Sequence, residues 1–501
     1  TRKAQIEIIK ELSIKKEMLK SDISSKSALD KLIEEEIVLV RKVQKYRINV
    51  LDSKNDKKNV LTRDQAKAVG MVDLSKHDTY LLYGVTGSGK TEVYMNLMDK
   101  VIQMGKRAIM LVPEISLTTQ MISRFYSRFG SRVAIFHSGL SNGEKYDEYL
   151  KIYRNEIDIV VGTRSAIFTP LKNIGLIVLD EEHSETFKQD SNPRYNAVDM
   201  AIFRGKYNNC PVILGSATPS LEAMARARKG IFKLIAMPNR VGGAVLPQIE
   251  IVDMALEMKK RNTILSEHLQ DEIRKNLERG EQTILLLNRR GHSTIVTCQA
   301  CGYVYKCPYC DISLTYHKTS NNLRCHYCGY TILKDNICPE CHEEALNYMG
   351  LGTEKLEQTL KEMYKDARII RMDVDTTSNK GSHEKIINDF KEHKYDILLG
   401  TQMISKGLDF PLVTLVGVIN ADSSLNIPDF RSGERTFELL SQVAGRAGRS
   451  NLAGRVIIQT FNPDHYAITL AKNHDYIDFY KDEMVGEIEE DTTVEDSIDE
   501  V

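Results

Sequence analysis

A glycine-rich segment near residue 90 has the residue types and spacing of a phosphate-binding loop. GVTGSGKT, residues 84–91, follows the apolar run TYLLY and leads into a stretch with helical spacing. Glycines let a backbone wrap around phosphates, and a helix start offers free N–H groups to an anion. Lys90 is expected to reach the β- and γ-phosphates of ATP, and Thr91 to hold Mg²⁺. The alternative is a structural glycine-rich turn. The predicted nucleotide-binding residues of this segment are Gly84, Val85, Thr86, Gly87, Ser88, Gly89, Lys90 and Thr91.

A cluster of acids closes a second apolar run. LIVL is followed by DEEH, residues 180–183. We expect this strand to lie next to the phosphate-loop strand, where Asp180 would bind Mg²⁺. Glu181 would then orient or deprotonate the attacking water. Alone, the segment fits a solvated strand end equally well, but its place downstream of a phosphate loop favours catalysis.

Two arginines three residues apart lie in QVAGRAGR, residues 442–449. Arg446 and Arg449 would share one helical face, and planar guanidinium groups suit a γ-phosphate approached across a cleft. We therefore predict that both act as arginine fingers. Helical arginines ordinarily form a solvated surface, but the small neighbours here allow close approach.

Eight of the nine cysteines form four C-x2-C pairs, at 298/301, 307/310, 325/328 and 338/341. Eight thiolates are enough for two closed tetrahedral Zn²⁺ sites. Each C-x2-C pair with its turn is called a knuckle below. Iron–sulfur ligation is the alternative, although four regular knuckles with Gly and Pro turns favour zinc. A disulfide framework is not expected in one patch of a long chain without a signal peptide. Spacing alone permits several pairings of the knuckles.

These residues require elements that bring distant segments together. Apolar runs alternate with helical patterns in a first series, and a second series is interrupted by the cysteine pairs. This alternation predicts parallel sheets with helices on both faces and functional groups at the strands' carboxyl ends. The predicted fold class is α/β, with two RecA-like lobes and a two-zinc module inserted in the second. The first series is TYLLY, RAIMLVP, VAIFHS, IDIVVGT, LIVLDEEH and PVILGSAT; the second is QTILLLNRR, ARIIRMDV, YDILLGT, LVTLVGVINAD and GRVIIQT.

Composition is that of a globular protein, with 42 % hydrophobic and 27 % charged residues and a net charge of −1 among 501 residues. The last sixteen residues hold eight acids and no base, so the remainder carries 68 basic against 61 acidic residues. A mildly basic body is compatible with phosphate contacts. No apolar run approaches the length of a membrane span, so we expect no membrane contact. The first residue is Thr1 rather than Met.

Together these motifs resemble superfamily 2 helicases, and most closely the PriA family (primosomal protein N′) of replication restart. LTRDQ, residues 61–65, resembles the Q-motif, in which Gln65 would read adenine. VPEISLT, HSGLS and GTRSAIF resemble strand-tracking motifs, the last with Thr163 and Arg164, and GSATPS, residues 215–220, resembles the motif linking hydrolysis to movement. LLLNRRG and GTQMISKGLDFP resemble the second lobe's motifs, with Gly407 and Asp409 at the nucleotide. PDFRSGERTFELLSQVAGRAGR, residues 428–449, is particularly typical of the family.

The resemblance implies an ATP-dependent helicase that moves 3′→5′ on single-stranded DNA. It implies ATP, Mg²⁺ and two Zn²⁺ as cofactors, and an aromatic-rich loop after DEEH in which Phe187 and Tyr195 stack on bases and Arg194 meets a phosphate. Packing of both aromatics inside the lobe is the alternative. It also implies a nested zinc pairing: Cys298, Cys301, Cys338 and Cys341 at one ion, and Cys307, Cys310, Cys325 and Cys328 at the other.

Implied partners are single-stranded and forked DNA, primosome proteins, a helicase loader and single-stranded-DNA-binding protein, in the bacterial cytoplasm at the nucleoid. Two other functions are considered: a fork-binding scaffold that recruits the loader, and a duplex DNA translocase. We expect this chain to have no counterpart of the family's N-terminal domain, which recognises a nascent 3′ end, or of its C-terminal domain. We therefore expect a motor core. The expected parts are a winged-helix-like DNA-binding unit (1–54), an ATP-binding first lobe (60–240), a second lobe (241–296 and 344–484), a zinc module (297–343) and a disordered acidic tail (485–501).

Overall fold

The computed structural model describes most of the chain outside its last residues and several internal segments. The described residues are 2–18, 20–41, 46–48, 59–113, 119–243, 246–260, 264–287, 295–298, 300–317, 320–348, 353–373, 376–377, 381–401, 404, 410–447 and 454–484. They form two units, residues 1–49 and residues 50–501. None of the described helices is long and apolar enough to cross a membrane.

The first unit is a small helical body. It contains α1 (Arg2–Lys15), η1 (Lys20–Asp22) and α2 (Lys26–Glu34), packed around buried Ile8, Leu29 and Leu32. A winged-helix-like unit would carry wing strands after these helices, but the described residues 35–41 and 46–48 are turns, bends and irregular backbone. Residues 42–45, 49 and 50 lie outside the described part. The expected strands are therefore not formed by the described residues, and the winged-helix assignment stays a prediction.

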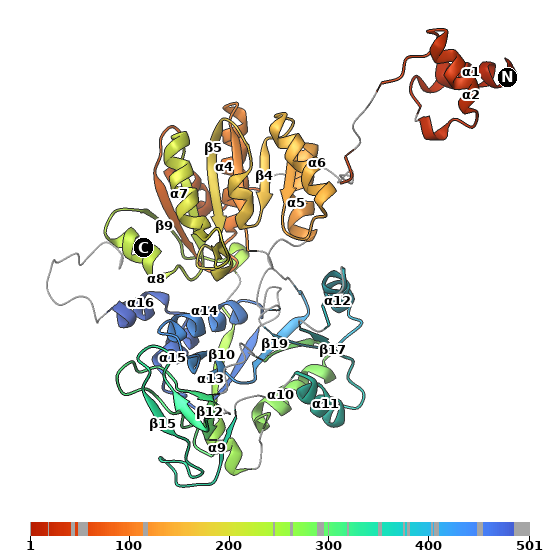
Figure 1. Ribbon diagram of the computed structural model, residues 1–501. Helices are drawn as coiled ribbons and strands as arrows, with labels where there is room; N and C mark the ends of the chain where they lie inside the picture. The colour runs from red at the N-terminus through yellow and green to blue at the C-terminus, as the bar shows by residue number, and fades with distance from the viewer. Residues whose placement is uncertain are drawn as a thin grey trace. The chain divides into compact units, whose positions relative to one another are not determined.

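The first lobe is built on one seven-stranded parallel sheet in the order β3-β4-β2-β5-β8-β1-β9. Figure 1 labels β4, β5 and β9 of this sheet. All six predicted strands are present, and β9 adds an edge that the sequence did not predict. The prediction that the DEEH strand β5 lies directly beside β1 is wrong, because β8 lies between them. The strands are β1 (Thr79–Gly84), β2 (Arg107–Leu111), β3 (Val133–Phe136), β4 (Ile159–Gly162), β5 (Ile174–Asp180), β8 (Val212–Ser216) and β9 (Lys233–Met237).

Helices cover both faces of this sheet, because successive strand residues point to opposite sides and both sides are apolar. Leu82 and Met110 pack in one core with α4, whereas Leu81 and Leu111 pack in another with α7 and α8. The helices are α3 (Arg63–Met71), α4 (Lys90–Gln103), α5 (Thr119–Phe129), η3 (Gly130–Arg132), α6 (Asn142–Tyr153), η4 (Arg164–Phe168), η5 (Glu185–Phe187), α7 (Ala197–Asn208), α8 (Leu221–Arg228) and η6 (Val241–Gly243). A short hairpin of β6 (Lys188–Gln189) and β7 (Tyr195–Asn196) precedes α7.

The second lobe has a six-stranded parallel sheet in the order β10-β20-β19-β11-β18-β17. The five predicted strands are present, and β10 is an unpredicted edge. The strands are β10 (Gln248–Asp253), β11 (Gln282–Leu286), β17 (Ile369–Met372), β18 (Ile397–Gly400), β19 (Val413–Val418) and β20 (Arg455–Thr460). The helices are α9 (Met254–Lys259), α10 (Glu267–Glu278), α11 (Thr353–Met363), α12 (Ser382–Lys391), α13 (Asp422–Leu425), α14 (Ser432–Ala444), α15 (Tyr466–Lys472) and α16 (Tyr476–Met484).

The cysteine-rich module is inserted between β11 and α11 of this lobe. Its ends pair as the antiparallel strands β12 (Val296–Cys298) and β16 (Leu346–Tyr348), so the insertion leaves and rejoins the lobe at one place. Inside lies a three-stranded sheet of β13 (Thr315–His317), β14 (Asn322–Arg324) and β15 (Thr331–Leu333). The lobe-2 sheet is therefore continuous without the module, as the predicted fold class requires.

Candidate functional site

The phosphate loop joins the end of β1 to the start of α4. Gly87 and Gly89 have φ angles of 85° and 79°, a region that glycine enters without steric cost. Lys90, the first residue of α4, is largely buried, and its Nζ donates to the Gly84 carbonyl at 2.7 Å. The loop is thus a compact turn whose lysine lies inside it, with Thr91 in the first turn of α4.

The predicted adenine reader, Gln65, joins the start of α3 to this loop. Its Oε1 accepts from Thr62 N at 2.9 Å, which completes a capping box, and its Nε2 donates to Ser88 O at 3.2 Å. A pocket of about 670 Å³ opens beside it, lined by Thr62, Arg63, Asp64, Lys67, Asn239 and Arg240. A pocket of this size at the start of α3 is large enough for the base of a nucleotide.

Asn239 and Arg240 of this pocket come from a segment that the sequence did not predict to be part of the site. Asn239 donates to Asp64 Oδ2 at 2.9 Å, and Val241 N donates to Gly87 O at 3.0 Å, so residues 239–241 lie along the loop. The Arg240 side chain lies closest to Gly87, where a Cβ would meet its Cγ at 3.7 Å. No motif marks these positions, because they follow the unpredicted strand β9.

Asp180 lies at the carboxyl end of β5, where it is partly buried. Tyr94 Oη, from α4, donates to Asp180 Oδ1 at 3.0 Å. Burial, and secondarily the neighbouring Glu181 carboxylate, raise the pKa of Asp180 to about 6, while Lys90 and Tyr94 oppose the shift. A bound cation would hold this carboxylate ionised. Asp180 is therefore suited to hold Mg²⁺, with Tyr94 fixing its orientation.

Backbone geometry supports this arrangement. Glu181 has a φ of 52°, an uncommon conformation for a residue with a side chain. Gly215, at the end of β8, leaves room for Tyr94, since a Cβ there would lie 1.7 Å from Tyr94 Oη. The close approach of β8 to Tyr94 thus explains the glycine of the GSATPS segment.

Removing the Tyr94 hydroxyl should weaken Mg²⁺ use without unfolding the lobe. We expect Tyr94→Phe to raise the Mg²⁺ concentration needed for half-maximal ATP hydrolysis by about 10- to 100-fold, the usual effect of losing a group that orients a metal ligand. Titration of ATPase activity with Mg²⁺ measures this. Tyr126→Phe, which removes another hydroxyl of the first lobe, is the control. An unchanged Mg²⁺ dependence in Tyr94→Phe would contradict the role of Tyr94.

The last two residues of DEEH connect β5 to other segments. Glu182 accepts from Ser220 N at 2.7 Å and from Ser220 Oγ at 3.1 Å, and burial raises the pKa of Glu182 to about 7. His183 Nδ1 lies 2.7 Å from Ser216 Oγ, and its Nε2 lies 2.7 Å from Gln442 Nε2 of the second lobe. If the amide of Gln442 donates to Nε2, Nδ1 is the ring nitrogen that donates to Ser216 Oγ. DEEH, GSATPS and α14 are thus in direct contact.

The second lobe meets the phosphate loop at the end of α14. A Cβ on Gly445 would lie 2.5 Å from Thr86 Cγ2, so only glycine permits this approach. The next residue, Arg446, is 9 % exposed. The other predicted lobe-2 nucleotide residues, Arg449, Gly407 and Asp409, lie outside the described residues, so their roles stay predictions. The structure brings the start of the predicted finger segment to the loop.

The predicted DNA-coupling residues differ in burial, and only the exposed or half-buried ones can contact DNA. Phe187 is 2 % exposed and belongs to the first lobe's core, so the base-stacking prediction for this residue is wrong and the packing alternative holds. Tyr195 is half-buried and makes an edge contact with Phe168 at 4.9 Å between ring centroids. Arg164 donates to the carbonyls of Thr186 and Lys188, which braces the loop.

The remaining two residues of this prediction differ in exposure. Thr163 is buried, whereas Arg194 is exposed and donates to Asp190 O at 3.0 Å. Arg194 and Tyr195 thus remain as the candidate contacts to a nucleic acid. Sequence alone does not distinguish an exposed loop aromatic from a buried one, because burial depends on tertiary structure.

The cysteines form two clusters of four. Cys298, Cys301, Cys338 and Cys341 form one, and Cys307, Cys310, Cys325 and Cys328 the other, with all sulfurs of a cluster within 4.8 Å. This is the nested pairing that the resemblance implied. Sγ–Sγ distances of 3.5–3.7 Å exclude disulfides, which need about 2.05 Å. They fit a tetrahedron of Zn–S bonds of about 2.3 Å, whose edges are about 3.8 Å.

Each knuckle has the same backbone turn. The residue four positions after the first cysteine has positive φ, and its N–H donates to that cysteine's carbonyl at 2.9–3.1 Å. These residues are Gly302, Asp311, Gly329 and His342. The turns place both sulfurs of a knuckle on one side, so the thiolates are arranged for closed metal sites. Gly302 also lets the module pack on the second lobe, since a Cβ there would lie 2.3 Å from Phe461 Cβ.

Three family models match the chain in an order that follows these elements. DEAD/DEAH box helicase matches residues 62–227, the PriA DNA helicase Cys-rich region matches residues 307–332, and the helicase conserved C-terminal domain matches residues 338–451. The first covers the phosphate loop and DEEH, the second the inner cysteine cluster, and the third most of the second lobe.

Curated relatives agree with these matches. The chain is 55 % identical over 414 residues to the replication restart protein PriA of Bacillus subtilis, covering 82 % of this chain and 51 % of the relative. It is 44 % identical over 480 residues to that of Synechocystis (93 % and 58 %), and 43 % identical over 490 residues to that of Chlamydia muridarum (95 % and 65 %). The chain thus spans about half to two thirds of these relatives' lengths. With its two parallel-sheet lobes, nested cysteine clusters and these relatives, the chain belongs to the PriA family of superfamily 2 helicases.

Proposed function

We propose that this chain is an ATP-dependent DNA helicase of replication restart, moving 3′→5′ on single-stranded DNA. The observation that carries the proposal is the meeting of three segments between the lobes. Gly445, directly after α14, packs on Thr86 of the phosphate loop, and Gln442 of α14 contacts His183 of DEEH. Nucleotide-binding groups held by both lobes are what a motor needs if hydrolysis is to change the distance between them.

Each residue has a proposed role in hydrolysis. Lys90 and the loop amides bind the β- and γ-phosphates, Thr91 and Asp180 hold Mg²⁺, and Gln65 reads the base. Glu181 accepts the proton of the attacking water. Mg²⁺, when bound, neutralises charge on the phosphate oxygens. Arg446 and Arg449 approach from the second lobe and stabilise the transferred group's charge, with Gly407 and Asp409 beside them.

The chain's DNA contacts and partners follow from the family. Arg194 and Tyr195, with Thr163 and Arg164 behind them, would couple a bound strand to DEEH, which directly precedes their loop. The zinc module would act as a rigid projection that assists strand separation. Forked DNA, primosome proteins, a helicase loader and single-stranded-DNA-binding protein are the proposed partners, at the bacterial nucleoid.

Strand-displacement and triplex-displacement assays distinguish the proposed helicase from a duplex DNA translocase. We expect ATP-dependent displacement of a duplex strand from a substrate with a 3′ single-stranded loading end, and none from the same duplex with a 5′ end. A duplex translocase would instead displace a third strand from a triplex without separating the duplex. Triplex displacement without strand displacement would overturn the proposal.

A further inference from the structure

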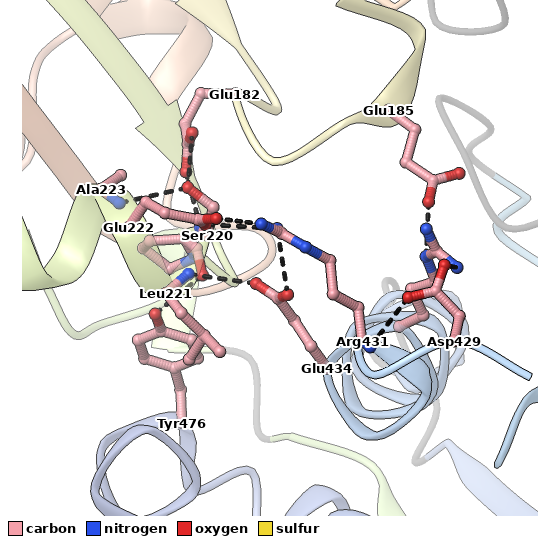
Figure 2. Close-up of polar contacts among 12 residues, drawn as sticks. Glu182, Glu185, Ser220, Leu221, Glu222, Ala223, Asp429, Arg431, Glu434 and Tyr476 are labelled. Carbon is pink, nitrogen blue, oxygen red and sulfur yellow. Dashed lines mark hydrogen bonds and ion pairs between the residues drawn. The ribbon is translucent and has the colours of Figure 1, made fainter. Parts of the chain in front are cut away.

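The first helix after the GSATPS segment is capped by a residue of the other lobe (Figure 2). Leu221 N, the first helical amide of α8 in lobe 1, donates to Glu434 Oε1 of α14 in lobe 2 at 3.0 Å. The helix's own N-cap, Ser220, accepts from Ala223 N at 3.3 Å. The first amides of a helix lack partners within it, and a cap normally comes from the preceding residues. Here one of them depends on the second lobe.

An ion pair joins the same two elements. Arg431, directly before α14, binds both carboxylate oxygens of Glu222 in the first turn of α8, one through Nη2 and the other through Nη1 at 3.3 Å. Arg431 Nη1 also lies 3.5 Å from Glu434 Oε2. A bidentate arginine fixes the relative orientation of its partner more strictly than a single contact does. Figure 2 shows Arg431 between the two carboxylates.

These contacts continue into the nucleotide site. Ser220 N, the amide next to Leu221 N, donates to Glu182 of DEEH, and Tyr476 Oη of α16 donates to Pro219 O at 2.7 Å. The consecutive backbone amides of Ser220 and Leu221 therefore donate hydrogen bonds to two carboxylates. One belongs to Glu182 of DEEH and the other to Glu434 of the second lobe. Glu434 is 5 % exposed and burial raises its pKa, so the loss of its partners would be costly.

Other residues of α14 face the first lobe in the same way. Arg435 pairs with Glu185, which follows DEEH, and also with Asp429 at 2.6 Å. Residues 431, 435, 442 and 445 are spaced by four, seven and three positions, so they share one helical face. That face carries both the contacts to DEEH and the contacts to α8.

We propose that Glu434 and Arg431 form an interlobe latch on the first turn of α8, and that closing the latch holds the GSATPS segment in position for strand movement. The inference rests on the proposed helicase function and assigns positioning roles to two residues of the family-typical PDFRSGERT segment. When the lobes separate, Leu221 N loses its acceptor and Glu222 loses Arg431. Lobe closure and the position of residues 219–221 are therefore linked.

A charge exchange tests the ion pair. Arg431→Glu and Glu222→Arg each place like charges together, and the double variant restores an opposite pair at a half-exposed position. We expect each single variant to raise the ATP hydrolysed per base pair unwound on the order of tenfold or more, the effect of losing a charge-assisted contact. The double variant should recover part of the coupling, because the 431–222 pair returns while position 431 no longer pairs with Glu434. Absence of recovery, with both singles impaired, overturns the latch, as do single variants with unchanged coupling.

Glu434 is tested by truncation and by an uncharged replacement. Glu434→Ala should uncouple hydrolysis from unwinding, whereas Glu434→Gln keeps an oxygen for Leu221 N and should retain most of the coupling. Glu362→Ala, on α11, is the matched control. If a single variant or Glu434→Ala is unstable, its rescuing variant decides the outcome. A charge-exchange double variant or a Glu434→Gln protein that recovers the melting temperature but not the coupling counts against the latch. A wild-type chain that neither hydrolyses ATP nor unwinds DNA would instead refute the proposed function.

Discussion

Lys90→Ala is expected to abolish DNA-stimulated ATP hydrolysis, lowering kcat by about a hundredfold or more. The lysine is the first residue of α4 and lies inside the phosphate loop. No other cation of the described loop residues, 84–91, is available to replace it. Removing one preorganised group that stabilises developing charge typically costs 10²–10³ in rate. Steady-state ATPase assays with and without single-stranded DNA measure the loss.

The neighbouring helix provides the control for this experiment. Lys100→Ala changes an exposed lysine in the last turn of the same helix and should leave hydrolysis near the wild-type rate. Because Lys90 donates only to Gly84 O within the loop, the substitution should lower the melting temperature little. Normal DNA-stimulated hydrolysis by Lys90→Ala would refute the assignment of the phosphate loop.

Removing one thiolate of the inner cysteine cluster should separate unwinding from hydrolysis. We expect Cys307→Ser to lower bound zinc from two ions to about one per chain and to abolish strand displacement. Structural zinc sites contribute about 10–16 kcal/mol of apparent binding free energy, so the module around the inner site would unfold. Because the lobe-2 sheet is continuous without the module, ATP hydrolysis should persist. Metal analysis together with the two activity assays measures these outcomes.

The ninth cysteine is the matched control. Cys210 is buried in the first lobe, away from both clusters, so Cys210→Ala should keep two zinc ions and strand displacement. Two bound zinc ions in Cys307→Ser would contradict its role as a ligand. Loss of hydrolysis together with unwinding would show that the module also supports the motor.

The eleven strands predicted from continuous apolar runs are all present, because central strands of a parallel sheet are buried on both faces. The two strands of the lobe sheets that were not predicted, β9 and β10, each lie at one edge of their sheet. Only two of the five residues of β9 and one of the six residues of β10 are buried, so no continuous apolar run marks them. The phosphate loop and the cysteine knuckles were predictable for a related reason: each is a local motif whose chemistry depends on short spacing.

Contacts between distant segments could not be predicted in this way. The residues of α14 that face the first lobe have regular helical spacing, but nothing in that spacing identifies Glu222 or Leu221 as partners. Phe187 shows a second kind of error: an aromatic residue in a polar loop is predicted to be exposed, whereas this side chain is buried in the core. Sequence motifs therefore located the nucleotide site, whereas the connections between its parts required the structure.

The nested arrangement of the cysteine clusters has a consequence for how the module assembles. The inner site closes the chain between Cys310 and Cys325, a span that already contains the hairpin of β13 and β14. Once the inner site has bound its metal, closing the outer site orders only the two short segments 302–306 and 329–337. Closing a short loop costs less chain entropy than closing a long one. Metal should therefore enter the inner site first, and the outer site should be the one that a chelator empties first.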